Sequence, residues 1–299
     1  MRHALAIRLP ATMLTLAGVW LAYTTAAYTQ TPPPSKGTPR QIIHRAATFQ
    51  KVKEGLFMIQ GDGGNVAAYV TDEGVILVDD MYERNYDDVM SQVKAITNKP
   101  IRYVLNTHHH DDHAGANIGM LGAGVEVIQH RNARLNTVAL KQPGPARVTF
   151  NDQIEVHLGG KEVRAFYFGR AHTSGDAIIY FPELKVIHTG DVFLSRSTQP
   201  YIDSDGGGSA IEWTKVLDGI DKLDFDTVIP GHGALSDRAG LAAWRVTFET
   251  LRSKVGTMVK AGRDKAAISK MLTADYGWPV GGLALGQLDA FMAEMKSAR

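Results

Sequence analysis

Short apolar runs separated by turn-forming residues fill the chain from about Phe49 onward. The first of them predict strands at residues 56–59, 66–70 and 75–78. Loops rich in glycine and acidic residues separate these strands. The pattern indicates a meander of short antiparallel strands, and its last strand ends at the acidic pair Asp79 and Asp80.

The period of the apolar residues changes between Glu83 and Thr97. Apolar side chains recur there at helical spacing, at Tyr86, Val89, Met90, Val93 and Ile96. Asn98-Lys99-Pro100 ends the predicted helix, and residues 101–106 predict another buried strand. This order of strand, helix and strand indicates a sheet that is covered by helices.

The short apolar runs typical of strands and the helical spacing of apolar residues both continue downstream. Further strands are predicted at residues 125–128, 148–150, 154–156, 163–168, 178–180, 186–187 and 228–229, and helices at residues 133–140 and 210–222. Beyond Gly233 the pattern is helical. A regular apolar stripe runs from Leu241 to Met258, Gly262 ends that helix, and Asp264 caps the next one.

Potential metal ligands follow the strand at 101–106 without interruption, from His108 to His113. His108 and His110 alternate, so an extended backbone points both side chains the same way. Asp112 and His113 lie past a bend and can face a second metal. Imidazoles and carboxylates are the ligands that suit zinc in a site left open for chemistry.

Three later strand ends or turns carry the same kind of residue beside glycine. They are Gly169-Arg-Ala-His172, His188-Thr-Gly-Asp191 and Pro230-Gly-His232. One such residue is more often a cap or a core residue, but four recurrences indicate one shared site. A long loop, residues 193–209 with Tyr201, Asp203 and Asp205, is expected to wall or cover this site. Asp79 is expected to organise the metal loop through hydrogen bonds rather than to form a catalytic dyad with Asp80.

Composition removes several alternatives. The chain has 299 residues, a formal net charge of +1 and no cysteine. The absence of cysteine excludes disulfides, thiolate zinc sites and a cysteine nucleophile. The basic residues form no stripe, so no nucleic-acid partner is expected.

The N-terminus has the three-part pattern of a secretory signal peptide. Arg2 and Arg8 precede an apolar segment at about residues 9–22, and the small residues Thr25-Ala26-Ala27 fit a cleavage site. The apolar segment is short for a membrane span, so no stable membrane insertion is expected after cleavage. We therefore predict a signal peptide (1–27), a Pro- and Thr-rich flexible leader (28–48) and a periplasmic or secreted catalytic domain (49–299), with a helical C-terminal extension from about residue 236.

The motif His108-x-His110-x-Asp112-His113, followed by His172, Asp191 and His232, resembles that of the metallo-β-lactamase fold superfamily. The resemblance spans about residues 50–235 and implies an α/β fold (α+β), a four-layer αββα sandwich with its metals at one edge between the sheets. It also implies two zinc ions. His108, His110 and His172 would hold the first, Asp112, His113 and His232 the second, and Asp191 would bridge both, whereas His109 and Asp111 would not be primary ligands.

This resemblance implies a hydrolase that acts on a small-molecule substrate. Zinc lowers the pKa of bound water to about 7, so hydroxide is available at neutral pH to attack a carbonyl carbon. Asp112 would orient that water and carry its proton as the catalytic residue. The exported members that open β-lactam antibiotics, and so confer antibiotic resistance, are the natural comparison, and no Ser-His-Asp triad through Ser174 is needed.

Two departures from those lactamases keep other substrates open. Many of them have cysteine at the position of Asp191, whereas aspartate is typical of glyoxalase II-like thioesterases. The commonest subclass has a substrate-binding lysine at the position of Leu194, and Arg196 or Arg170 are the alternatives for that role. The same machinery acting on lactones, thioesters or other esters is therefore the main alternative; an iron-dependent oxidation of sulfur compounds and a non-enzymatic metal-binding role rank lower.

Overall fold

The computed structural model describes residues 45–197, 199–278 and 287–297. The predicted signal peptide (1–27) and most of the predicted leader (28–48) lie outside these residues. None of the described helices is both long and apolar enough to cross a membrane.

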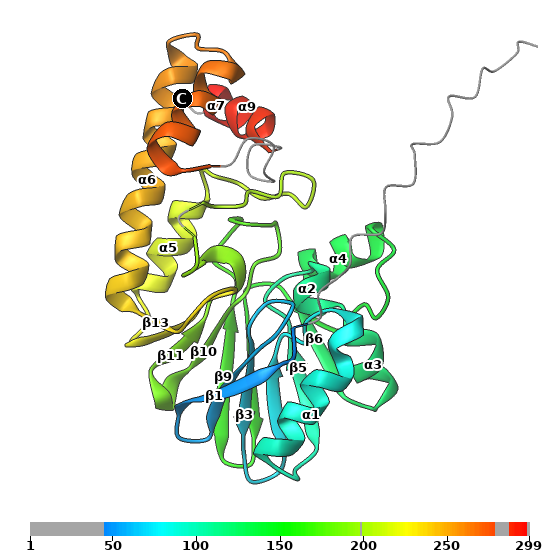
Figure 1. Cartoon of the computed structure of the whole chain (residues 1–299). Coiled ribbons are helices and arrows are strands. Elements are labelled where there is room, and N and C mark those ends of the chain that lie inside the picture. The colour runs from blue at the N-terminus through cyan, green and yellow to red at the C-terminus, as the bar shows by residue number, and fades with distance from the viewer. Residues whose placement is uncertain (1–44, 198, 279–286, 298–299) are drawn as a thin grey trace, which may run out of the picture. The chain divides into compact units, whose positions relative to one another are not determined.

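The first sheet combines the predicted meander with a parallel half (Figure 1). Within the described residues its strands follow chain order: β1 (Thr48–Lys53), β2 (Leu56–Gln60), β3 (Val66–Val70), β4 (Val75–Val78), β5 (Ile101–Leu105), β6 (Glu126–His130) and β7 (Val148–Phe150). β1 to β4 are antiparallel, which confirms the meander, and β4 to β7 are parallel. Strand β1 was not predicted, because its side chains present no buried face.

The second sheet is built from the later strands. Its order in the described part of the chain is β13 (Ser236–Asp237), β12 (Thr227–Ile229), β11 (Val186–His188), β10 (Ile178–Phe181), β9 (Lys161–Phe166) and β8 (Gln153–Leu158). β11 and β12 are parallel neighbours, whereas the other pairs are antiparallel. The parallel pair makes the carboxyl ends of β11 and β12 neighbours at one edge of the sheet.

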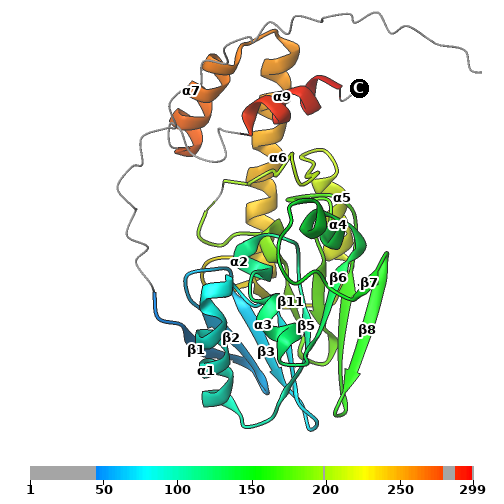
Figure 2. The ribbon, with the colours of Figure 1, turned by 90° about the vertical axis from the view of Figure 1, so that its right-hand side faces the viewer.

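The helices fall into two groups along the chain. The first group is η1 (Glu83–Asn85), α1 (Tyr86–Ile96), α2 (Asp111–Ala114), α3 (Asn117–Gly122) and α4 (Arg131–Ala139). The later group is η2 (Pro182–Leu184), η3 (Gly190–Val192), α5 (Trp213–Asp221), α6 (Arg238–Lys260), α7 (Lys265–Tyr276) and α9 (Leu288–Ser297). Figures 1 and 2 show α1 and α3 beside the first sheet and α5 and α6 beside the second.

Three apolar clusters bind these layers together. One lies between the sheets and joins residues such as Ile76 of β4 to Ile179 of β10. A second packs α1 against the first sheet, and a third packs α5 and α6 against the second. The layer order is therefore helix, sheet, sheet, helix, which confirms the predicted αββα sandwich.

The C-terminal helices extend the third cluster. Ile268 of α7 and Phe291 of α9 are buried in it together with Phe248 of α6. As predicted, Asp264 caps α7, since its carboxylate accepts a hydrogen bond from the backbone N–H of Ala267 at 2.8 Å. The helices α7 and α9 are thus packed parts of the fold rather than a loose tail.

Candidate metal centre

The side chains singled out from the sequence converge where the carboxyl ends of β4 and β5 meet those of β11 and β12. The sheets are tied together there by Asn65, whose backbone N–H donates to Gly231 O at 2.8 Å and whose side-chain amide donates to Pro230 O at 2.8 Å. The predicted ligands at this edge are His108, His110, Asp112, His113, His172, Asp191 and His232.

These side chains form two groups of three with one carboxylate between them. The ligand atoms of His108, His110 and His172 lie within 4.8 Å of one another, and so do those of Asp112, His113 and His232. The carboxylate is Asp191, whose Oδ1 lies 3.1 Å from His113 Nε2 and 3.5 Å from His232 Nε2. Its Oδ2 lies 3.8 Å from His172 Nε2 in the other group, so the carboxylate touches both.

In each of these histidines one ring nitrogen faces the centre of the cluster, and the other, the outer nitrogen, faces away from it. The outer nitrogens of His108 and His113 take part in hydrogen bonds that lead to Asp79. His113 Nδ1 lies 2.8 Å from the Asp79 carboxylate and donates to it, so Nε2 is the nitrogen that faces inward. The Thr107 hydroxyl donates to Asp79 at 2.8 Å, so its oxygen accepts from His108 Nδ1 at 3.0 Å. The Nε2 atoms of both rings therefore face inward, and that of His108 does so with its lone pair.

The outer nitrogens of His110 and His172 are engaged by the long loop. His172 Nδ1 lies 2.6 Å from the carbonyl oxygen of Tyr201, which can only accept. His110 Nε2 lies 2.9 Å from Asp203 Oδ2. Since these outer nitrogens carry the protons, Nε2 of His172 and Nδ1 of His110 face inward with their lone pairs.

The inward lone pairs are closer together than uncharged acceptors tolerate. His110 Nδ1 lies 3.2 Å from His108 Nε2 and 2.9 Å from His172 Nε2. Imidazole nitrogens that face one another without protons need a shared cation. Neutral imidazoles with engaged outer nitrogens, beside carboxylates, are the donor set that fits zinc.

The charge balance of the cluster agrees with this fit. Burial and the neighbouring imidazoles hold the pKa of His108 well below its usual range, and the same causes lower the pKa of His172 to about 4. Although burial opposes it, the charge of His113 holds the pKa of Asp191 far below its usual range and lowers that of Asp112 to about 2. The site thus combines the neutral imidazoles of His108 and His172 with ionised carboxylates, which attract positive charge.

His113 shows this attraction directly. Burial lowers the pKa of a histidine, yet the carboxylates of Asp191 and Asp112 raise that of His113 well above its usual range. In the metal-free protein a proton is therefore held at this ring beside Asp191. A metal ion that binds here displaces that proton.

The acidic pair at the end of β4 has the organising role expected of it. Asp79 accepts from the backbone N–H of Thr107 at 2.7 Å, in addition to its contacts with the Thr107 hydroxyl and His113. Asp80 accepts from the backbone N–H of Ala116 at 3.1 Å. Burial, together with the charge of Asp79, raises the pKa of Asp80 well above its usual range, so the two carboxyl groups differ in charge.

The remaining polar residues singled out from the sequence lie outside the two groups of three. His109 is buried and forms a separate group with His110 and Asp203, whereas Asp111 is exposed at the start of α2. Ser174 lies in the turn after His172, and its hydroxyl accepts from the Asn136 amide at 3.2 Å. Arg170 is engaged by Glu212, with a nitrogen–oxygen distance of 2.6 Å.

Two further histidines lie apart from the cluster. His157 is exposed. His130 is buried and has a structural role. Its ring stacks on Tyr167 with the centroids 3.8 Å apart, and its Nδ1 accepts from the backbone N–H of Asn132 at the start of α4.

The contacts of Asp203 and Tyr201 with the histidines were not predicted, although their loop was expected beside the site. One signal in the sequence is the run Gly206-Gly-Gly208. A Cβ on Gly206 would lie 2.1 Å from Asp203 Oδ2, and a Cβ on Gly208 would lie 2.3 Å from the carbonyl oxygen of His172. Glycine is required there because the loop backbone passes directly against the Asp203 side chain and against the backbone at His172.

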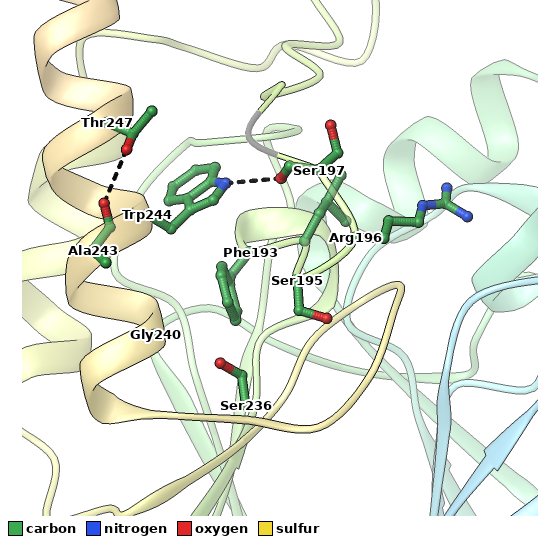
Figure 3. A pocket seen from close by; sticks show the side chains of 10 residues that line it. Phe193, Ser195, Arg196, Ser197, Ser236, Gly240, Ala243, Trp244 and Thr247 are labelled. Carbon is green, nitrogen blue, oxygen red and sulfur yellow. Dashed lines mark hydrogen bonds between the residues drawn. The ribbon is translucent and has the colours of Figure 1, made fainter. Parts of the chain in front are cut away.

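A cavity of about 590 Å³ lies beside the cluster, between residues 193–197 and α6. Trp244 forms part of its wall and donates to Ser197 O at 3.3 Å (Figure 3). Leu194 also lines this cavity and is 7% exposed. Its aliphatic side chain presents no charge to a substrate. Arg196 is exposed, and Figure 3 shows its side chain pointing away from Trp244 and Phe193.

Comparisons with known proteins agree with this geometry. The family model described as the metallo-beta-lactamase superfamily matches residues 59–232, more than half of the chain. Metallo-beta-lactamase IND-1 of Chryseobacterium indologenes is 28% identical over 198 residues, which are 64% of this chain and 78% of that protein. The 2,4-dinitroanisole O-demethylase subunit alpha of Nocardioides sp. (strain JS1661) is 27% identical over 192 residues, 62% of this chain and 57% of that protein.

Solved structures show the same fold. The metallo-beta-lactamase from Pontibacter korlensis superimposes with a TM-score of 0.62 at 18% sequence identity. The match covers 99% of that chain and 68% of this one. The shared part is therefore a complete sandwich domain, and this chain contains a further third.

Proposed function

The chain belongs to the metallo-β-lactamase superfamily and is a metal-dependent hydrolase; from this premise we propose that it is an exported dizinc enzyme that opens cyclic amides, with β-lactams as its substrates. Export rests on residues 1–27, and N-terminal sequencing of protein from the periplasm or medium tests it, with a start after Ala27 expected. Antibiotic resistance would follow from export together with β-lactam hydrolysis.

One observation supports this proposal most strongly. Three imidazoles, those of His108, His110 and His172, have their outer nitrogens engaged, so their inner lone pairs converge with no proton between them. We assign His108, His110 and His172 to the first zinc and Asp112, His113 and His232 to the second, with Asp191 shared. A cluster arranged in this way favours cation binding over a purely structural role.

When bound, zinc supplies Lewis acidity for a carbonyl oxygen and makes water a nucleophile at neutral pH. The chain's own contribution centres on Asp112. Its side chain is 23% exposed against 10% for Asp191, so Asp112 faces the side from which water and substrate arrive. Because its pKa is about 2, it is ionised at neutral pH and can orient a water molecule, accept its proton and deliver that proton to the leaving group.

The remaining contacts keep this arrangement fixed during the reaction. Asp112 Oδ2 lies 3.1 Å from His232 Nε2, which restrains the carboxylate, and Asp79 restrains His113 from behind. The leaving nitrogen of an opened lactam needs a proton, and Asp112 is the exposed carboxylate of the cluster. Preorganised groups of this kind lower the barrier because they need no rearrangement during the reaction.

Hydrolysis assays test the proposal directly. Zinc-loaded protein should open the ring of a penicillin and a carbapenem, followed by loss of ring absorbance, and metal analysis should find two zinc ions. Removal of the metal with a chelator should abolish the reaction and added zinc should restore it. Absence of turnover in protein with two bound zinc ions would contradict the β-lactam assignment.

A second candidate function has its own support. Leu194 is buried where the commonest lactamase subclass has a cationic lysine, and Asp191 replaces a cysteine. One relative is named for O-demethylation of 2,4-dinitroanisole, a reaction at a carbon–oxygen bond. Hydrolysis of lactones, thioesters or other esters uses the same groups, so these substrates belong in the same assay.

Arg196 is the residue that we expect to take over recognition of a substrate carboxylate. Ser195 N donates to His232 O at 3.1 Å, which holds the segment around Arg196 beside the second metal group. Arg196→Ala should raise KM for an anionic substrate about two- to fivefold with little change in kcat, because an exposed charge pair contributes at most about 1 kcal/mol and contributes to binding alone. Steady-state kinetics measure this, with Arg170→Ala as the control, since Arg170 is engaged by Glu212. An equal rise in KM for both variants would contradict the assignment.

A further inference from the structure

The loop at residues 199–211 supports two of the clustered histidines from behind. Tyr201 O accepts from His172 Nδ1 at 2.6 Å, and the Asp203 carboxylate accepts from His110 Nε2 at 2.9 Å. The backbone N–H of Asp203 also donates to His172 O at 2.9 Å. The orientation of both rings therefore depends on where this loop lies.

The end of this loop is anchored by helix α9. The carboxylate of Glu294 accepts from the Ser209 hydroxyl, from the backbone N–H of Ala210 at 2.8 Å and from that of Ile211 at 3.3 Å. Gln287, at the start of α9, accepts from the Ser204 hydroxyl in the middle of the loop. These contacts join positions more than 80 residues apart in the chain.

Helix α9 is itself held firmly. Leu288, Phe291 and Met295 are buried in the cluster that includes α6. Figures 1 and 2 both show α7 and α9 at the end of α6 that lies away from the strands. Helix α9 also lies beyond residue 232, where the match to the family model ends, so this anchor is an addition to the matched sandwich.

We propose that α9, through Glu294, is a positioning element that sets the metal affinity of the group His108, His110 and His172. This inference rests on the proposed function, in which that group holds zinc. Glu294 touches no ligand side chain; it fixes the segment 209–211, which continues backward to Asp203 and Tyr201.

The physical reason lies in the three donors that share one carboxylate. Without Glu294 the backbone N–H groups of Ala210 and Ile211 lose their acceptor, and the loop gains alternative positions. In those positions Asp203 and the Tyr201 carbonyl no longer hold the two rings with their lone pairs inward. The rings must then be ordered when metal binds, and that ordering cost appears as weaker metal affinity.

Glu294→Ala in the full chain tests this inference, with Asp289→Ala as the matched control. Asp289 lies on the same helix but is exposed and pairs with Lys265 of α7 at 2.6 Å rather than with the loop. Zinc affinity is measured by competition with a chromophoric chelator, and the absorption spectrum of the cobalt-substituted protein reports on the ligand geometry. Asp203→Ala serves as the reference variant for the group His108, His110 and His172. Loss of a partner such as Asp203 costs about 10- to 100-fold in metal affinity, so the step of the zinc titration that this variant weakens is the one that belongs to that group.

We expect Glu294→Ala to lower the zinc affinity about 3- to 10-fold in the binding step that Asp203→Ala also weakens. We also expect it to alter the cobalt spectrum. Asp289→Ala should retain both properties of the wild type. Glu294→Gln keeps one acceptor oxygen and should show a smaller but measurable loss of affinity. If Glu294→Ala cannot be obtained folded, a measurable loss in Glu294→Gln supports the inference and wild-type affinity overturns it.

Two results would overturn the inference while leaving the proposed function intact. One is wild-type affinity and an unchanged cobalt spectrum in Glu294→Ala; the other is an equal loss in Asp289→Ala, which would mean that general packing of α9 is responsible. A wild-type protein that binds no zinc would overturn the proposed function as well. Failure of the inference and failure of the proposed function are therefore detected by different measurements.

Discussion

Asp191→Ala is expected to lower kcat/KM for the hydrolysed substrate by at least a thousandfold, which corresponds to about 4 kcal/mol of transition-state stabilisation. Asp191 is the carboxylate that both metal groups share, with contacts at 3.1 Å to His113 and 3.8 Å to His172. In the dizinc centre that we propose, removing it takes away a ligand and a negative charge at once. We therefore expect loss of one of the two proposed zinc ions, measured by metal analysis beside the kinetics.

The matched comparisons for this prediction are Asp205→Ala and Asp191→Cys. Asp205 is an exposed carboxylate in the adjacent loop and should tolerate alanine without a change in zinc content. A thiolate is a zinc ligand, so Asp191→Cys should restore zinc binding to a large extent. Full activity of Asp191→Ala with two bound zinc ions would show that the carboxylate is not a ligand.

Much of the centre was predictable because each ligand follows a recognisable element. Strand β5 is an apolar run that stops before His108, and β12 stops before Pro230-Gly-His232. Strand ends of this kind are set by local patterns, and the parallel pairing of β4 with β5 and of β11 with β12 then brings them together. The periodicities predicted a sheet covered by helices, whereas the αββα order of the layers was implied by the resemblance to the superfamily.

The parts that escaped prediction depend on contacts between distant segments. The contact between Asp203 and His110 spans 93 positions and the contact of Glu294 with Ala210 spans 84. No local pattern marks such pairs, since an aspartate in a loop or a glutamate on a helix usually faces solvent. Strand β13 is two residues long, too short for any alternation to be visible.

Asp79→Asn is expected to lower the free energy of unfolding of the metal-free protein by about 2–4 kcal/mol, although the side chain keeps its size. Asp79 is fully buried and accepts three hydrogen bonds: from the Thr107 backbone at 2.7 Å, from the Thr107 hydroxyl at 2.8 Å and from His113 Nδ1 at 2.8 Å. An asparagine presents an NH₂ group to at least one of these donors. A buried donor that faces another donor loses its hydrogen bond without water to replace it.

The neighbouring substitution Asp80→Asn provides the control, because both carboxyl groups are fully buried and adjacent in the chain. Because the pKa of Asp80 is raised well above its usual range, the fold favours the uncharged acid, which asparagine resembles, and asparagine can still accept from Ala116 N. We expect a loss below about 1 kcal/mol at pH 7, measured by urea unfolding of the metal-free protein, since bound zinc would add its own stabilisation.

The pH dependence separates the two residues further. The folded protein keeps a proton on Asp80 that the unfolded chain releases above its ordinary pKa of about 3.9, so the folded state binds more protons and stability falls as pH rises. Asp80→Asn should remove this contribution to the fall of stability with rising pH. Asp79→Asn should only reduce the contribution, because it removes the negative charge that helps to raise the pKa of Asp80. Equal losses at pH 7 and identical pH profiles for the two variants would contradict the division of roles, in which Asp79 holds the metal loop and Asp80 fills the space behind it as a neutral acid.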